Sequence, residues 1–229
     1  ATATEVSTIG TADNDGTLNV VNAWNSNVTG NIVLNGGTLQ GGAITVANAN
    51  GIKGRGLVSS RVVNNTRLEA NVAASTLVFE TAANDNDWDG GGNTGILAAS
   101  NGGTLEVRDN ATFTYGGTVA ATGGGRVYAK GFGLNFASTS TVNLTAATLE
   151  TDESTSVDGA INVAAGGDST IKVQVNRFLT IDVVRALRDK GAGGAICFAA
   201  GFRETGDYDA DGERLQRDLG WLGFGQLAS

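Results

Sequence analysis

The stretch Asn35-Gly36-Gly37-Thr38-Leu39 returns later in the chain as Asn101-Gly102-Gly103-Thr104-Leu105. Looser echoes are Asp15-Gly16-Thr17-Leu18, Ser75-Thr76-Leu77 and Ala147-Thr148-Leu149. Their separations scatter around multiples of roughly 20 residues, a period typical of repeats that bury their apolar faces only against neighbouring repeats. The pattern therefore predicts a stack of similar β coils.

Short β-prone segments separated by Gly, Asn and Thr turns fill the chain between Asp15 and Val175. In Thr104-Leu105-Glu106-Val107 and Thr170-Ile171-Lys172-Val173 the aliphatic residues share one side of the strand, and Glu106 and Lys172 lie on the other. This alternation favours an all-β parallel β-helix, or β-solenoid. The expected strands are Thr17–Val21, Asn31–Leu34, Ala43–Val46, Arg67–Ala70, Leu77–Glu80, Thr104–Val107, Thr112–Tyr115, Arg126–Ala129, Thr141–Leu144, Ala160–Val163 and Thr170–Val175.

Composition agrees with that architecture. The 229 residues include 35 Gly and no Pro, so glycine and asparagine make the turns and every backbone N–H is available to a ladder. An aromatic content of 6% suits a thin interior of small aliphatic side chains. The character of the sequence changes near Thr180, which predicts a solenoid over 1–179 and a short α/β tail or cap over 180–229.

The charge and the missing residue types exclude several function classes. A net charge of −8, with no cluster of Lys and Arg, argues against nucleic acid as a partner. The absence of His excludes Ser-His-Asp and Cys-His catalysis and any His-ligated metal. The single Cys197 cannot form an intrachain disulfide, and no apolar run approaches the roughly 20 residues of a membrane span.

The tail carries two resemblances. Helical spacing is expected over Ile181–Gly191, a buried strand over Ala195–Ala199, and a second helix over Gly212–Leu219. The stretch Val183–Glu204 resembles part of the succinyl-CoA-synthetase-like region of NDP-forming acyl-CoA synthetases. The phosphohistidine of that family has no counterpart in a chain without His, so no ligase activity is expected.

An acidic loop follows. In Asp207-Tyr208-Asp209-Ala210-Asp211-Gly212, alternating carboxylates could wrap a hard cation, and Asp218 stands at loop position twelve. The loop is similar to the calcium loop of dockerin modules and EF-hands, although Arg214 replaces an aliphatic residue and Asp218 replaces a glutamate. The alternative is a solvated acidic loop before a helix. The candidate Ca²⁺ ligands here are Asp207, Asp209, Asp211, Glu213 and Asp218.

A similar alternation occurs within the solenoid, in Asp85-Asn86-Asp87-Trp88-Asp89-Gly90. Asp85, Asp87 and Asp89 are candidate calcium ligands, but Ile96 stands where a closing carboxylate would be needed. An Asx-turn loop that projects from a coil is the competing interpretation. Both interpretations place this segment at the surface.

Carboxylates and aromatic rings are the remaining groups for polysaccharide chemistry. Neighbouring coils could bring the Asp85 loop near Glu106 or Asp109 at the spacing of a glycosidase pair, and a lyase would use Arg126 or Lys130 as its base. Trp24 and Trp88, which lie among polar residues, could stack on sugar rings. Core packing is the alternative role for both tryptophans.

The style of residues 17–175 resembles the passenger repeats of bacterial autotransporters and of surface adhesins with degenerate Gly-Gly-Thr-Leu coils. That resemblance implies an extracellular or cell-surface location and a non-catalytic structural or adhesive role. We expect a calcium-stabilised, self-associating module whose partners are cell-surface glycans or other copies of itself. The alternative is a polysaccharide-processing β-helix, either a glycoside hydrolase or a lyase, of the tailspike kind.

Overall fold

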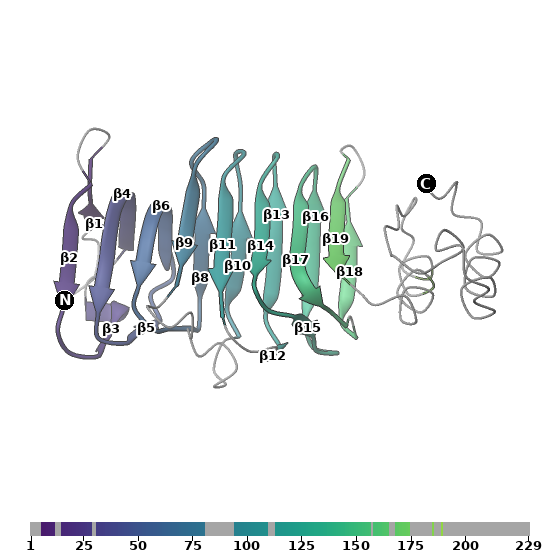
Figure 1. Cartoon of the computed structure of the whole chain (residues 1–229), viewed down its shortest axis with the longest axis horizontal. Helices are drawn as coiled ribbons and strands as arrows, with labels where there is room; N and C mark the ends of the chain where they lie inside the picture. Colours follow the sequence, from purple (N-terminus) through teal and green to yellow (C-terminus); the bar gives the residue numbers. More distant parts are fainter. Residues whose placement is uncertain are drawn as a thin grey trace, which may run out of the picture.

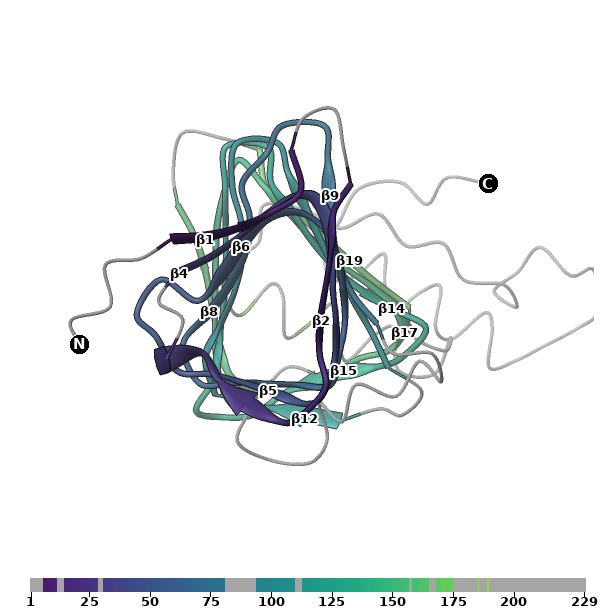
Figure 2. The same ribbon diagram turned by 90° about the vertical axis from the view of Figure 1, so that its left-hand side faces the viewer.

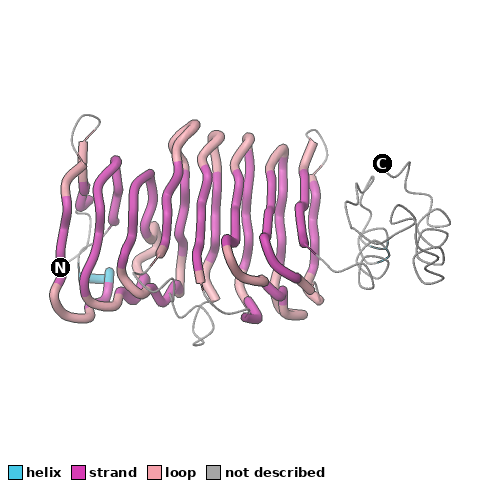
Figure 3. The backbone as a smooth tube through the Cα atoms, in the orientation of Figure 1, coloured by secondary structure: helices cyan, strands magenta, loops and turns pink. Residues whose placement is uncertain are grey.

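The computed structural model is a parallel β-solenoid whose coils stack side by side along a rod (Figure 1), with strands and turns alternating around each coil (Figure 3). It describes residues 6–11, 15–28, 31–80, 94–109, 113–156, 158–164 and 168–174, together with residues 185 and 189. All strand pairs in this part of the chain are parallel, and the expected fold class is confirmed.

Three walls enclose the interior, as the view along the rod shows (Figure 2). Wall A and wall B belong to one 14-stranded sheet, because β4 (Asn31–Gly41) and β6 (Ile52–Ser59) bend around the corner between them. Besides the first halves of β4 and β6, wall A consists of β1 (Val6–Ile9), β8 (Arg67–Ala70), β10 (Ile96–Ala99), β13 (Thr118–Thr122), β16 (Thr141–Thr145) and β18 (Ala160–Val163).

Wall B holds the second halves of β4 and β6. Wall C is made of two smaller sheets. The other strands of wall B are β2 (Thr17–Val20), β9 (Thr76–Phe79), β11 (Thr104–Arg108), β14 (Arg126–Lys130), β17 (Thr148–Ser154) and β19 (Thr170–Gln174). Wall C contains β3 (Trp24–Asn25), β5 (Ile44–Val46) and β7 (Val62–Asn64) in one sheet, and β12 (Phe113–Tyr115) and β15 (Leu134–Phe136) in the other; a short 3₁₀ turn, η1 (Ser26–Val28), follows β3.

The recurring phrase marks the corner from wall A to wall B. Thr17-Leu18 lies in register with Thr38-Leu39, and Thr76-Leu77 lies in register with Thr104-Leu105. The residue two positions before the threonine adopts the left-handed backbone conformation in several coils: φ is 51° at Ala74 and 71° at Gly102. Glycine adopts that conformation without steric cost, which is why the phrase is rich in Gly. The repeat therefore records one corner of the coil.

Inward side chains of wall B stack as a continuous apolar row. Leu77, Leu105, Val127 and Leu149 are each 0–1% exposed and follow one another in register across four coils. Burying one such side chain contributes roughly 1.5–3 kcal/mol. Because each coil packs only on its neighbours, this row supplies the adhesion between coils.

Wall C is interrupted between β7 and β12 among the described residues. Two buried polar side chains bind the chain where it re-enters at Gly95: Asn64 donates from Nδ2 to the Ile96 carbonyl at 3.1 Å, and the Tyr115 hydroxyl donates to the Gly95 carbonyl at 2.6 Å. Buried polar groups have to be satisfied in this way. The expectation of open edges at the two rod ends alone therefore needs correction, because wall C also breaks midway.

Several predicted elements can be compared directly. The strands Arg67–Ala70 and Ala160–Val163 have the expected bounds, and the other expected strands differ by a few residues at one or both ends. Of the helix expected in the tail, Arg185 and Asp189 are described, and both are helical. The expected strand over Ala195–Ala199 and the second helix over Gly212–Leu219 lie outside the described residues.

Candidate functional site

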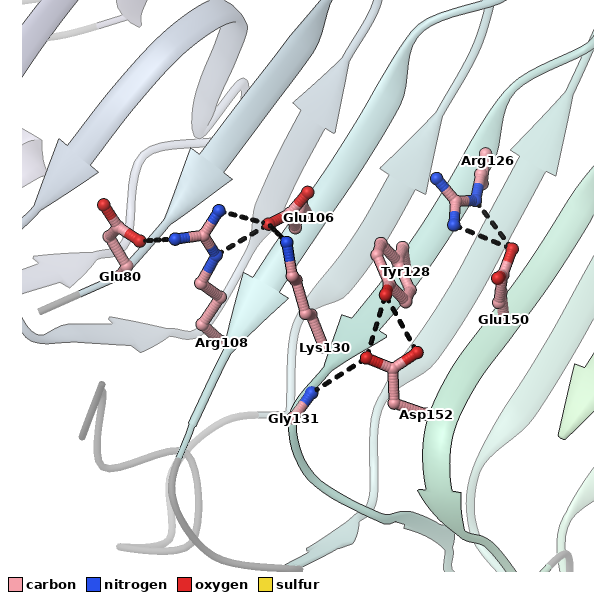
Figure 4. A network of polar contacts seen from close by, with 9 residues as sticks. All are labelled: Glu80, Glu106, Arg108, Arg126, Tyr128, Lys130, Gly131, Glu150 and Asp152. Carbon is pink, nitrogen blue, oxygen red and sulfur yellow. Dashed lines mark hydrogen bonds and ion pairs between the residues drawn. The ribbon is translucent and has the colours of Figure 1, made fainter. Parts of the chain in front are cut away.

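A band of charged side chains covers the outer side of wall B from β9 to β19 (Figure 4). Its central row runs along the rod axis, because strand register places Glu106 opposite Tyr128, Tyr128 opposite Glu150, and Glu150 opposite Lys172. These positions alternate with the buried aliphatic residues of the same strands, so they point outward by the period of two. We call this set the wall B band; its charged and aromatic members are Glu80, Glu106, Arg108, Arg126, Tyr128, Lys130, Glu150, Asp152 and Lys172.

Glu106 lies between two cations. Its Oε1 atom accepts from the Arg108 guanidinium at 2.6 Å and lies 3.4 Å from the Lys130 ammonium. Arg108 also pairs with Glu80, which follows β9 on the preceding coil. The Glu106 side chain is 12% exposed, so this carboxylate is held by its partners in a partly desolvated position.

Glu150 has the same arrangement one coil further on. Its Oε2 atom accepts from Nε and Nη2 of Arg126 at 2.8 Å and lies 3.5 Å from Nζ of Lys172. Arg126 comes from β14 and Lys172 from β19, so the carboxylate on β17 joins three successive coils. The Arg126 guanidinium also lies 4.1 Å from the centre of the Tyr128 ring, within the range of a cation–π contact.

Tyr128 donates its hydroxyl to Asp152, whose two carboxylate oxygens both lie 2.8 Å away. The Gly131 backbone N–H also donates to this carboxylate, at 3.3 Å. Desolvation of the phenol and the hydrogen bond to Asp152 raise the pKa of Tyr128 to about 12. Tyr128 is therefore a hydrogen-bond donor at neutral pH and does not act as a base there.

A second charged cluster lies on wall A. Glu69 accepts from Arg67 Nε and from the Ser100 hydroxyl, each at 2.9 Å, and strand register places Lys53 opposite it. Burial acts to raise the pKa of Glu69, but the hydrogen bonds from Arg67 and Ser100 outweigh burial and hold the pKa below its usual value. This carboxylate therefore stays ionised in the folded protein at neutral pH.

The candidate residues proposed from sequence fall into two groups. Glu106, Arg126 and Lys130 come together in the wall B band, whereas Asp109, which follows β11, is 3% exposed. Trp24 is partly buried and packs against the core, with its indole Nε1 buried and unpaired, so much of its ring serves packing. The remaining candidates lie outside the described residues: Asp85, Asp87, Trp88, Asp89, Asp207, Asp209, Asp211, Glu213 and Asp218.

Glu80, Arg108, Tyr128, Glu150, Asp152 and Lys172 were not proposed as site residues from sequence, although Lys172 was placed on the outer side of its strand. A signal for the central row does exist. Glu106, Tyr128, Glu150 and Lys172 follow one another at steps of 22 residues, and each occupies the third position of its strand. Aligning the coils at that step would have placed the row.

Some groupings are absent from the part of the chain that the structure describes. Three or more His, Cys, Asp or Glu side chains do not gather there as a metal-binding set. In the same residues, the model contains no helix with the length and hydropathy of a membrane span. A shallow depression of about 380 Å³ lies over β16 and β18, where Leu144, Ile161 and Val163 reach its surface at the end of wall A.

Comparison with known proteins adds no relative: no family model, curated protein or solved structure matches this chain.

Proposed function

We propose that this chain is a non-catalytic structural or adhesive rod that acts outside the cell or on its surface. The observation that supports this most directly is the pairing of charged groups in the wall B band. Arg126 and Lys130, the candidate catalytic bases, contact the carboxylates of Glu150 and Glu106 at 2.8 Å and 3.4 Å. The same contacts bridge neighbouring coils, so stabilisation of the rod accounts for the charges.

The architecture fits that role physically. Backbone hydrogen bonds and inward aliphatic rows run from coil to coil, so each coil is held by its neighbours over its whole width. Rigidity of this kind suits a spacer or a display surface. The outer walls consist largely of polar side chains on flat strands, a surface on which hydrogen bonds to sugar hydroxyls are available at regular spacing.

The proposed partners are cell-surface glycans or further copies of the same chain. Glycans are favoured by the neutral pairing within the wall B band, where four cations and four carboxylates balance, because polar faces without a strong field bind neutral ligands through hydrogen bonds. Bound Ca²⁺ at the loops containing Asp85 and Asp207 belongs to the proposal through the alternating carboxylates of the sequence.

The test is to incubate the purified chain with a panel of acidic and neutral polysaccharides, with and without calcium. Retention on polysaccharide beads is measured together with new reducing ends and with absorbance from unsaturated uronates. Retention without product supports the adhesive rod. Release of product from a folded sample overturns the non-catalytic assignment.

A polysaccharide-processing enzyme is the second candidate, because Glu106 and Glu150 flank Tyr128 on the same outer surface. Two strand spacings separate them, roughly 9.5 Å, which is within the range for a pair of glycosidase carboxylates. Against this role, both carboxylates already accept from Arg and Lys side chains. If product appears in the assay, Glu106→Gln and Glu150→Gln should abolish it.

A further inference from the structure

The wall B band differs from the rest of its wall in how it joins coils. Between β2 and β6 the outward positions in register are Asn19, Gln40 and Ser59, which carry no charge. From β9 onward each neighbouring pair of strands is bridged by at least one charged contact. The bridges are Glu80–Arg108, Glu106–Lys130, Arg126–Glu150, Tyr128–Asp152 and Glu150–Lys172.

Like charges lie directly opposite each other within the band. Strand register pairs Arg108 on β11 with Lys130 on β14, an arrangement that destabilises a sheet unless an anion separates the two cations. Glu106 supplies that anion, since its carboxylate contacts both. The side chain of Glu106 is also the least exposed of this group.

We infer that Glu106 and Glu150 are acid-sensitive clasps, so that protonating them opens the coils from β9 to β19 selectively while the coils from β2 to β6 stay closed. The inference concerns the conformation of the rod and does not depend on the proposed function. Each clasp carboxylate binds two cations, so neutralising it removes two attractions and leaves two positive groups facing each other.

The charged surroundings of each clasp favour this response. Glu106 faces Arg108 on its own strand, Lys130 and Tyr128 on β14, and, through Arg108, Glu80 after β9. Glu150 faces Arg126 and Tyr128 on β14, Lys172 on β19 and Asp152 on its own strand. Arg and Lys keep their charge as the pH falls, whereas Glu and Asp lose theirs, so the band turns from neutral to positive. In a stack whose stability is a sum of neighbour contacts, the opening stays local.

Hydrogen exchange of the full-length chain at neutral pH, followed by mass spectrometry, tests the clasp directly. Glu106→Gln should raise exchange of the β11 and β14 amides about fivefold to tenfold and leave β4 and β6 unchanged. Adding Lys130→Gln removes the facing cation, and exchange should return most of the way to the wild-type value. The matched control is Glu153→Gln, which deletes an exposed carboxylate from β17 and should change exchange less than twofold.

A second measurement needs no variant. Exchange of the wild-type chain at about pH 4, corrected for the intrinsic pH dependence of the chemistry, should rise from β9 to β19 and not in β4 and β6. A rise of equal size in all coils would overturn the inference. A Lys130→Gln change that fails to restore protection in the Glu106→Gln background would overturn it as well, because loss of a hydrogen bond alone is not repaired by removing the cation.

Discussion

Leu105→Ala tests both the register and the energetic role of the inward row. Leu105 is fully buried, and its register partners are Leu77 on one side and Val127 on the other, so the substitution removes contacts with two coils. Three carbons leave the core, which costs roughly 2.4 kcal/mol in transfer free energy at about 0.8 kcal/mol per methylene. Backbone ladders hold the flanking strands apart and limit collapse of the cavity, so the total loss should be about 3–4 kcal/mol.

The assay is urea unfolding followed by circular dichroism, with hydrogen exchange of β9, β11 and β14 to locate the effect. The matched control is Thr104→Ala, one residue earlier on the same strand, which points outward and should cost about 0.5 kcal/mol or less. A register slip of one residue moves Leu105 to the outside and Thr104 to the core. A loss for Leu105→Ala no larger than that for Thr104→Ala would therefore refute the assigned register.

Three further predictions concern backbone contact and titration. Gly125→Ala should lower the melting temperature sharply, because its Cβ would lie 2.5 Å from the Ala99 carbonyl carbon and oxygen; Gly116→Ala, whose Cβ would meet Thr139 Oγ1 at an ordinary 3.6 Å, is the control. Since the folded-state pKa of Glu69 is lowered, its contribution is present above the unfolded pKa and lost as pH falls, so Glu69→Gln should flatten the acid side of a stability–pH curve. Tyr128 should titrate near pH 12 in an absorbance titration at alkaline pH, a step that Tyr128→Phe removes; because this folded pKa is raised, the Tyr128 contribution is full below the unfolded pKa and is lost as pH rises through about 12.

The sequence predicted the fold class and most of wall B because those strands combine regular alternation with a recognisable corner. It missed β6, because Gly54 and Gly56 interrupt the alternation and resemble a turn, although both lie inside the strand with φ of 117° and 129°. It also missed β10, Ile96–Ala99, where alanine has weak β propensity. In both cases packing against neighbouring coils overrides the local preference.

The charge pairing of the wall B band could be predicted in part. The outward position of Glu106 and Lys172 follows from alternation within a strand and was predicted correctly. Their partners lie on other coils, and identifying them requires the length of each coil. That length is 22 residues from Leu105 to Val127 but 28 residues from Leu77 to Leu105, so a fixed period places one side of the network and fails on the other.

The break in wall C has a consequence for how such a rod can change. Asn64 and Tyr115 fix the returning chain at Gly95, so the coil closes without help from the sequence that connects Glu80 to Thr94. Lengthening such a connection costs little: each doubling of a flexible loop adds only about 0.6 kcal/mol of closure entropy. This position is therefore a graft point, where a peptide epitope or a small folded domain can be inserted while the coils on either side keep their spacing.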